Sequence, residues 1–536
     1  MIKRNNNIKI FNLNDTKEAI EVFNHFKVDK NHLIENYKKK NFKSFVNEAK
    51  NFFGSWLIID FAKKRIITSP SFCGAYWDIE NNIISSSLGP IVKNRIKLRN
   101  QIIDNGNLLS EIYSETQAGS FELPVSTIFK NVFKIPPCVY SDKFDYYSLK
   151  SYLINDGKFF KEETFINEAQ NLSNKIYNNY KKVNLLFSGG IDSLILLSFL
   201  REVYTSDNLT ISYVDQPISG GHINQAIKIT KKLGVKLKIE KPNFDWEFAS
   251  SEKFEELTNL FSQNIVSPFH PFHAIKNENN ETLLIDGQNM DGLFLGKMSK
   301  ENSFKINKFF RIFKQFIKDS SSIDGVYNHN YLRFMNNFLT NIIYDKKLVL
   351  KKIDKNSFAL KTLQHQPFDK ESYLKDLSIV KNRFNFEPNF RNIFFYYYPF
   401  LNLINSTEFS SLNGGCLRFA SQNDFIDLWS SKLGFKNMFV KKNFFKKYIN
   451  RNLKIDFEKI DFEKTNYKTF DISKKDVILN SLKVLSNGSS KIYNFCDEET
   501  ALTLKDYFKK IELQKVIKKS LYPKIMKFYN YDCLLR

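Results

Sequence analysis

A largely apolar run followed closely by two glycines lies about a third of the way along the chain. Val183–Phe187 has the length of a buried strand, and Leu194–Leu200 has the length and composition of a buried helix. Between them lies Ser188–Ser193, with the sequence SGGIDS. Adjacent glycines let the backbone turn sharply and come close to a ligand. The pattern therefore predicts a strand, a glycine turn and a helix in close succession.

The same alternation continues downstream. We expect a strand over Leu209–Val214, a helix from about Ile223 to Leu233, and strands over Val235–Ile239 and Thr282–Ile285. Strands that alternate with helices indicate a parallel sheet, in which ligands bind at the carboxyl ends of the strands. Asp215, which follows the second strand, would face that ligand or be a solvated strand end.

The helix expected in this region has a recognisable face and stop signal. Ile223, Ala226, Ile227 and Thr230 recur at helical spacing, which places them on one side. Gly234 follows the last periodic position, where a left-handed residue commonly ends a helix. We therefore expect a helix that carries these four side chains on one face and ends at Gly234.

Shorter strand-like pieces precede this region. Ser55–Phe61 and Arg65–Thr68, separated by a polar turn at Ala62–Lys64, predict a β-hairpin, and further pieces occur at Tyr76–Trp77 and Ile83–Ile84. Three parts are expected: residues 1–145 rich in strands, residues 146–470 with the parallel sheet, and a helical extension over residues 471–536.

Composition sets the broad class. The 536 residues suffice for several domains, and no uninterrupted apolar run is long enough to span a membrane. The start of the chain lacks an apolar signal core, and its five cysteines form no C-x-x-C pair, so we expect a reduced, cytoplasmic protein. The net charge of +23 is spread along the chain and accompanies many Phe, Asn and Ile residues, which favours codon composition over nucleic-acid binding as its cause.

The glycine turn has the chemistry of an anion site. The first N–H groups of a helix, with its dipole behind them, attract negative charge. Ser188 and Ser193 add hydroxyl donors, whereas Asp192 would repel a phosphate unless a cation lay between them. The turn therefore predicts a polyphosphate bound with Mg²⁺, and an ordinary tight turn before a helix is the alternative.

The string SGGIDS resembles the pyrophosphate loop of the ATP pyrophosphatase superfamily, whose members split ATP into AMP and pyrophosphate. It differs from the Walker A loop because no G-K-[ST] follows it. The resemblance implies that Ser188, Gly189, Gly190, Asp192 and Ser193 bind ATP.

A second motif follows the strand at Thr282–Ile285. It reads DGQNMDGLFLG and resembles the G-E-G-x-D-E-L-F-G-G segment of asparagine synthetases. The resemblance implies that Gly287 lies at the ATP and that Asp291 joins Asp192 in holding Mg²⁺. Gln288 replaces a glutamate that handles protons of the attacking amine, and an amide cannot act as a base at neutral pH. The ring-closing β-lactam synthetases and lasso-peptide cyclases also carry a non-glutamate residue there.

Within residues 1–145, Gly54, Asp60, Gly74 and Tyr76 are followed by the run Ile135-Pro136-Pro137. This order is similar to that of the glutaminase-like domain of the same family, an Ntn-type α+β sandwich. That family hydrolyses glutamine with a cysteine directly after the initiator methionine, and here Ile2 stands at that position. Isoleucine cannot act as a nucleophile, and Cys73 lies inside the chain without a free α-amino group. We therefore expect a degenerate glutaminase-like domain.

Two features have weaker signals. The family's lysine that steadies the adenylation transition state has candidates in Lys464 and Lys468, each of which could equally be a surface charge. Residues 302–318 have a helical pattern with lysines and Arg311 on one side and aromatic residues on the other. We favour a docked helix with a solvated basic side over a recognition surface.

The resemblance implies that the sandwich is followed in the sequence by an adenine-nucleotide α-hydrolase-like domain with a parallel sheet. It also implies that the protein is an AMP-forming amide ligase that uses ATP and Mg²⁺. Its catalytic residues would be Asp192, Asp291 and Lys464, with Gln288 on the substrate side. The partners would be a small-molecule or peptide carboxylate and an amine, either ammonia or a group on the substrate itself, and a homodimer is one option. An ammonia-dependent asparagine synthetase, a tRNA-modifying ATP pyrophosphatase and a catalytically inactive scaffold are the alternatives.

Overall fold

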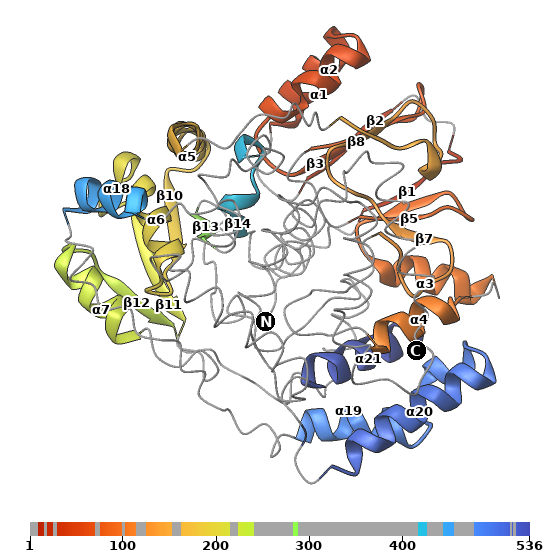
Figure 1. Cartoon of the computed structure of the whole chain (residues 1–536). Coiled ribbons are helices and arrows are strands. Elements are labelled where there is room, and N and C mark those ends of the chain that lie inside the picture. Colours follow the sequence, from red (N-terminus) through yellow and green to blue (C-terminus); the bar gives the residue numbers. More distant parts are fainter. Residues whose placement is uncertain are drawn as a thin grey trace, which may run out of the picture.

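The chain combines helices with both antiparallel and parallel sheets, which confirms the expected mixed α/β class (Figure 1). Its computed structural model describes residues 9–15, 19–24, 29–69, 75–98, 102–113, 125–152, 162–214, 223–240, 282–287, 416–425, 443–454, 476–514, 517 and 521–536. Within these ranges two sheets are antiparallel and one is parallel.

The N-terminal strands form two antiparallel sheets, ordered β2-β3-β4-β8-β9 and β1-β6-β5-β7. The expected hairpin is confirmed, because β3 and β4 pair from Leu57 opposite Thr68 to Asp60 opposite Arg65. The first sheet continues to β9, just beyond residue 145. The bounds are β1 (Ile10–Asn12), β2 (Ile20–Asn24), β3 (Trp56–Asp60), β4 (Arg65–Thr68), β5 (Tyr76–Asp78), β6 (Ile83–Ser85), β7 (Val132–Lys134), β8 (Val139–Ser141) and β9 (Lys150–Ser151).

These sheets are the inner layers of a four-layer sandwich. Successive side chains on a strand point to opposite faces, so Leu57 packs in one apolar cluster with Trp77 of the other sheet. Trp56 faces away, into a cluster with helices α1 (Lys30–Lys39) and α2 (Phe42–Glu48). On the far side, Tyr76 packs with α3 (Leu88–Lys97) and α4 (Asn105–Tyr113), so the layers are helix, sheet, sheet and helix (Figure 1).

The C-terminal helices cover the α3 and α4 side of this sandwich. They are α19 (Asp476–Ser486), α20 (Glu498–Glu512) and α21 (Tyr522–Leu535), and Figure 1 shows them beside α3 and α4. Lys527 of α21 forms a buried ion pair with Glu111 of α4. The described residues after position 475 are largely helical, and these helices share one apolar core with side chains between Tyr76 and Val132.

The parallel sheet has the strand order β12-β11-β10-β13-β14. The expected alternation of strand and helix is confirmed from β10 to β12, and the expected parallel sheet is confirmed because β10 pairs in parallel with both β11 and β13. A short strand that the sequence pattern did not indicate, β14, adds to the β13 edge. The strands are β10 (Lys182–Leu186), β11 (Leu209–Val214), β12 (Leu237–Glu240), β13 (Thr282–Asp286) and β14 (Cys416–Arg418).

The helices that pack in one apolar cluster with this sheet are α5 (Glu162–Asn179), α6 (Ile191–Val203), α7 (Ile223–Lys232) and α18 (Asn443–Leu453). Leu185 of β10 and Leu197 of α6 belong to the same buried cluster as Leu57 of the sandwich, so one apolar core spans both architectures. Burial of this continuous apolar surface is the main source of stability. In the part of the chain that the structure describes, no helix is both long and apolar enough to cross a membrane.

Candidate functional site

The SGGIDS loop lies at the carboxyl end of β10, the middle strand of the parallel sheet. From β10 the chain proceeds to β11 and β12 on one side, and later to β13 and β14 on the other. The direction of the strand order therefore reverses between β10 and β13. In open α/β sheets, the crevice outside the strand ends at such a reversal is where ligands bind.

Hydrogen bonds within the loop fix its shape. Gly189 has φ +75°, a left-handed conformation that only glycine adopts at little cost. The Gly190 N–H donates to Ser188 Oγ at 3.2 Å, and Ser193 Oγ donates to the Gly190 carbonyl at 2.9 Å. The two serine hydroxyls are 3.2 Å apart. The hydroxyls of Ser188 and Ser193, both predicted to bind ATP, therefore lie on the same side of one turn.

Helix α6 starts directly from the loop. Gly190 is its N-cap residue and supplies no side chain to cap the first N–H groups. Asp192 lies in the first turn, where a carboxylate is favourable beside the positive end of the helix dipole. This helix start can present both N–H donors and a carboxylate to a ligand.

Gly287 connects the second motif to the first. A Cβ atom built on Gly287 would lie 3.0 Å from the Asp192 carbonyl oxygen and 3.3 Å from Ser193 Cα. Real Cβ atoms rarely approach backbone this closely, so the end of β13 is packed directly against the first turn of α6. The two sequence motifs thus meet, and the requirement for glycine here is one of space.

Gln225 is a residue of the site that apolar periodicity did not indicate. Its side chain is only 3% exposed, and Nε2 donates to the Gly189 carbonyl at 2.8 Å. Of the side chains expected on one face of α7, Ala226 and Thr230 are buried, whereas Ile227 is 40% exposed. Gln225 and Ile229 complete the buried face. Compared with the face that apolar spacing indicates, the buried face of α7 is rotated toward Gln225, whose side chain reaches the loop. The spacing of apolar residues cannot indicate a buried polar side chain.

Several predicted site residues lie outside the described part of the chain: Ile2, Cys73, Asp215, Gln288, Asp291, residues 302–318, Lys464 and Lys468. Of the expected magnesium pair, only Asp192 is described. Among the residues that the structure does describe, no group of three His, Cys, Asp or Glu side chains could hold a metal ion.

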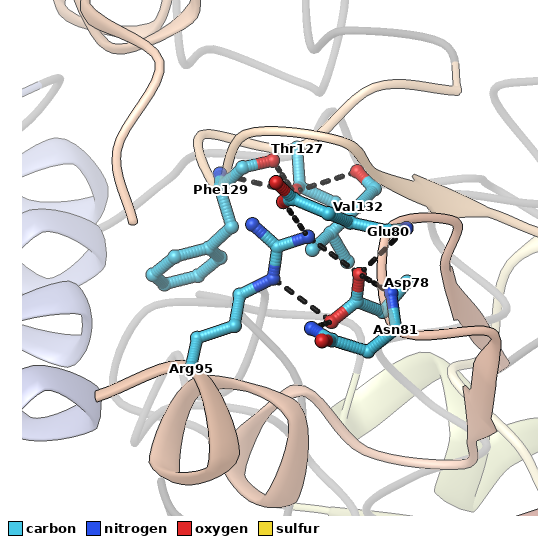
Figure 2. A network of polar contacts seen from close by, with 7 residues as sticks. All are labelled: Asp78, Glu80, Asn81, Arg95, Thr127, Phe129 and Val132. Carbon is cyan, nitrogen blue, oxygen red and sulfur yellow. Dashed lines mark hydrogen bonds and ion pairs between the residues drawn. The ribbon is translucent and has the colours of Figure 1, made fainter. Parts of the chain in front are cut away.

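The N-terminal sandwich contains a buried charge network (Figure 2). Arg95 of α3 is fully buried and binds both oxygens of Asp78, with Nε to Oδ2 at 2.8 Å. Glu80 Oε2 lies 2.9 Å from the same guanidinium, and the Asn81 amide donates to Asp78 Oδ2 at 2.7 Å. Nearby, Thr127 Oγ1 donates to the Val132 carbonyl at 2.9 Å. Since the charged groups bind one another, we interpret the network as the tie between α3 and the β5–β6 turn.

The structure describes the side chains of three cysteines, and none resembles an activated nucleophile. Cys138 and Cys533 are buried. Burial, together with the charge of Asp497, raises the pKa of Cys496 to about 11. This thiol stays protonated at neutral pH, and the thiolate is the form that attacks substrates.

Comparison with protein-family models gives no match for this chain. Its sequence also has no significant match among curated proteins.

Proposed function

We propose that this protein is an ATP-dependent, AMP-forming amide ligase of the asparagine synthetase type. It would adenylate a carboxylate and pass the acyl group to an amine. The observation that carries the proposal is the SGGIDS loop between β10 and α6, beside the strand-order reversal and against Gly287. The described parallel sheet would then be the core of an adenine-nucleotide α-hydrolase-like domain.

The residues of the loop fit a nucleotide phosphate. The N-terminal N–H groups of α6, a helix of 13 residues, lack a side-chain cap. The Ser188 and Ser193 hydroxyls can rotate from each other toward phosphate oxygens, since a hydroxyl both donates and accepts. Asp192 would hold Mg²⁺ together with Asp291, and the ion would neutralise phosphate charge. Gly189 and Gly190 would let the backbone approach the pyrophosphate.

The proposed reaction has two steps. A carboxylate oxygen of the substrate attacks the α-phosphorus, the bond to the bridging oxygen breaks, and pyrophosphate leaves. The amine nitrogen then attacks the acyl carbon, AMP departs with the former carboxylate oxygen, and the nitrogen loses a proton. Lys464 is the proposed group that steadies the phosphate charge. Gln288 can orient the amine by a hydrogen bond but cannot take its proton.

The N-terminal sandwich favours an amide ligase over a tRNA-modifying pyrophosphatase. Two antiparallel sheets between helical layers fit the glutaminase-like domain that the resemblance implies. This sandwich shares its apolar core with the parallel sheet, so the two parts support each other. The source of the amine stays open between free ammonia and a group on the substrate.

The test is ATP–pyrophosphate exchange. With Mg²⁺ present, labelled pyrophosphate should enter ATP only when the correct acid is added from a panel of aspartate, small amino acids and peptides. Asp192→Ala should lower this exchange by at least ~100-fold, because the phosphate charge loses its cation. Asp207→Ala, an exposed aspartate beyond the other end of α6, should leave exchange unchanged. Exchange that survives Asp192→Ala would contradict the proposal, and its absence with every acid would favour the inactive scaffold.

A further inference from the structure

Gln225 holds the glycine loop from a different structural element. It lies on α7, one crossover further along the chain than the loop, and its amide Nε2 donates to the Gly189 carbonyl at 2.8 Å. The side chain is 3% exposed. A buried hydrogen bond of this kind is costly to leave unmade, because water cannot replace the lost partner.

The bond fixes the orientation of one peptide group. A trans peptide is planar, and its C=O and N–H point in opposite directions. With the Gly189 carbonyl held by Gln225, the Gly190 N–H points to the other side, where it donates to Ser188 Oγ at 3.2 Å. Both residues that flank this peptide are glycines, so sterics alone do not prevent the plane from rotating.

Rotation of this peptide would replace a hydrogen-bond donor with an acceptor on one side of the loop. It would direct the Gly189 carbonyl oxygen, a negative end of a dipole, toward the side on which Ser188 and Ser193 gather. An anion site needs donors on that side. The loop therefore requires an anchor for the carbonyl, and Gln225 supplies one.

The anchor itself is rigid. Ala226 and Ile229 of α7 are 0% and 3% exposed and belong to the main apolar cluster. The position of the Gln225 amide is thus set by core packing.

We propose that Gln225 is a positioning residue that keeps the Gly190 N–H on the side of the loop where the phosphates of ATP would bind. This inference rests on the proposed function for the identity of the ligand. It assigns to α7 a part in nucleotide affinity that acts through the loop.

The test compares Gln225→Glu with Thr230→Val in the full-length chain. Glutamate has nearly the same shape as glutamine, and its ionised carboxylate cannot donate to the Gly189 carbonyl and repels it, whereas a buried carboxyl that stays protonated can still donate. Thr230→Val removes a buried hydrogen bond of the same helix that does not involve the loop. Gln225→Met, which has no donor in any protonation state and carries no charge, is measured beside it and decides the result where the two variants differ or where the glutamate variant fails to fold.

The first readout is amide hydrogen exchange of residues 187–193 without ligand. Exchange should accelerate roughly 3- to 10-fold in Gln225→Glu, the equivalent of one hydrogen bond, and stay at the wild-type rate in Thr230→Val. Equal rates in wild type and Gln225→Glu would overturn the anchoring of the loop.

The second readout is the KM for ATP in the exchange assay. We expect it to rise roughly 3- to 10-fold in Gln225→Glu with a smaller change in kcat. A mobile loop with an unchanged KM would overturn the role of Gln225 in nucleotide positioning. Failure of the proposed function has a different signature: wild type would give no exchange of label with any acid, while Gln225→Glu would still loosen the loop.

Discussion

Gly287 is the single residue at which the two candidate motifs touch. Its Cα lies where any side chain would press on the backbone of Asp192 and Ser193. The loop of β10 and the end of β13 can therefore share a ligand only while this position stays small. Glycine here serves packing rather than turning, since Gly287 has no left-handed φ and Gly189 has one.

Gly287→Ala should disturb the site through overpacking. The added methyl group meets the Asp192 carbonyl oxygen at 3.0 Å, so the strand end must shift, at a cost of about 1–3 kcal/mol in the free energy of unfolding. Thermal unfolding and the KM for ATP measure the two effects, and we expect the melting temperature to fall and the KM to rise.

Gly234→Ala is the matched control for that substitution. Gly234 has φ +64° and no atom within 4 Å of a built Cβ, so alanine there is strained without clashing. Its cost should be about 1–2 kcal/mol with no change in KM. If Gly287→Ala leaves the KM unchanged as well, the close approach of the two motifs has no part in binding ATP.

Helix α21 is fastened to α4 by a buried ion pair. Lys527 and Glu111 are 8% and 2% exposed, so neither charge is well hydrated. The contact links the C-terminal helices to the N-terminal sandwich, a separation in sequence of 416 residues. The ring of Phe129, 6.4 Å from that of Tyr531 between centroids, adds an apolar contact between the same layers.

Breaking this pair from one side should destabilise the C-terminal layer. Lys527→Met leaves a buried carboxylate without its cation, which costs about 3–5 kcal/mol. Removing both charges in Lys527→Met/Glu111→Leu should recover most of that loss, because no uncompensated charge stays buried. Urea unfolding of the single and double variants measures the coupling, and strictly additive losses would contradict this interpretation of the pair.

Elements with a local signal could be predicted from the sequence. The β3–β4 hairpin and the succession from β10 to β12 follow from periodicity, turn residues and Gly234, all within a few residues of one another. Strand β14 has only three residues, too few for periodicity, and its pairing with β13 depends on a distant segment. The packing of α21 likewise depends on contacts that no local pattern encodes.

In the candidate site, too, some features have a local signal in the sequence and others depend on tertiary packing. SGGIDS is contiguous, so its residue types and their order are enough to indicate its chemistry. The role of Gln225 depends on how α7 rotates against the core, and apolar spacing selected Ile227 instead. The contact of Gly287 with Asp192 arises from the parallel pairing of β10 with β13, which sequence alone suggests only through resemblance.

Across the described parts of the molecule, one apolar core runs from the antiparallel sandwich into the parallel sheet. The sandwich therefore supports the sheet that carries the loop, whatever chemistry it has of its own. Lys175 of α5 forms an ion pair with Asp424 just after β14, so the far edge of the sheet is also tied to this framework. A rigid support would suit the proposed site, which would have to keep water from an acyl-adenylate.

The proposed function requires that the loop direct cleavage of ATP between its α- and β-phosphates. The most direct measurement is product analysis with ATP labelled at the α-phosphate, in the presence of Mg²⁺, the acid identified by exchange, and an amine. We expect labelled AMP in a 1:1 ratio with amide product, and loss of both with Asp192→Ala. Labelled ADP as the product, or AMP formation that is indifferent to Asp192, would contradict the proposal.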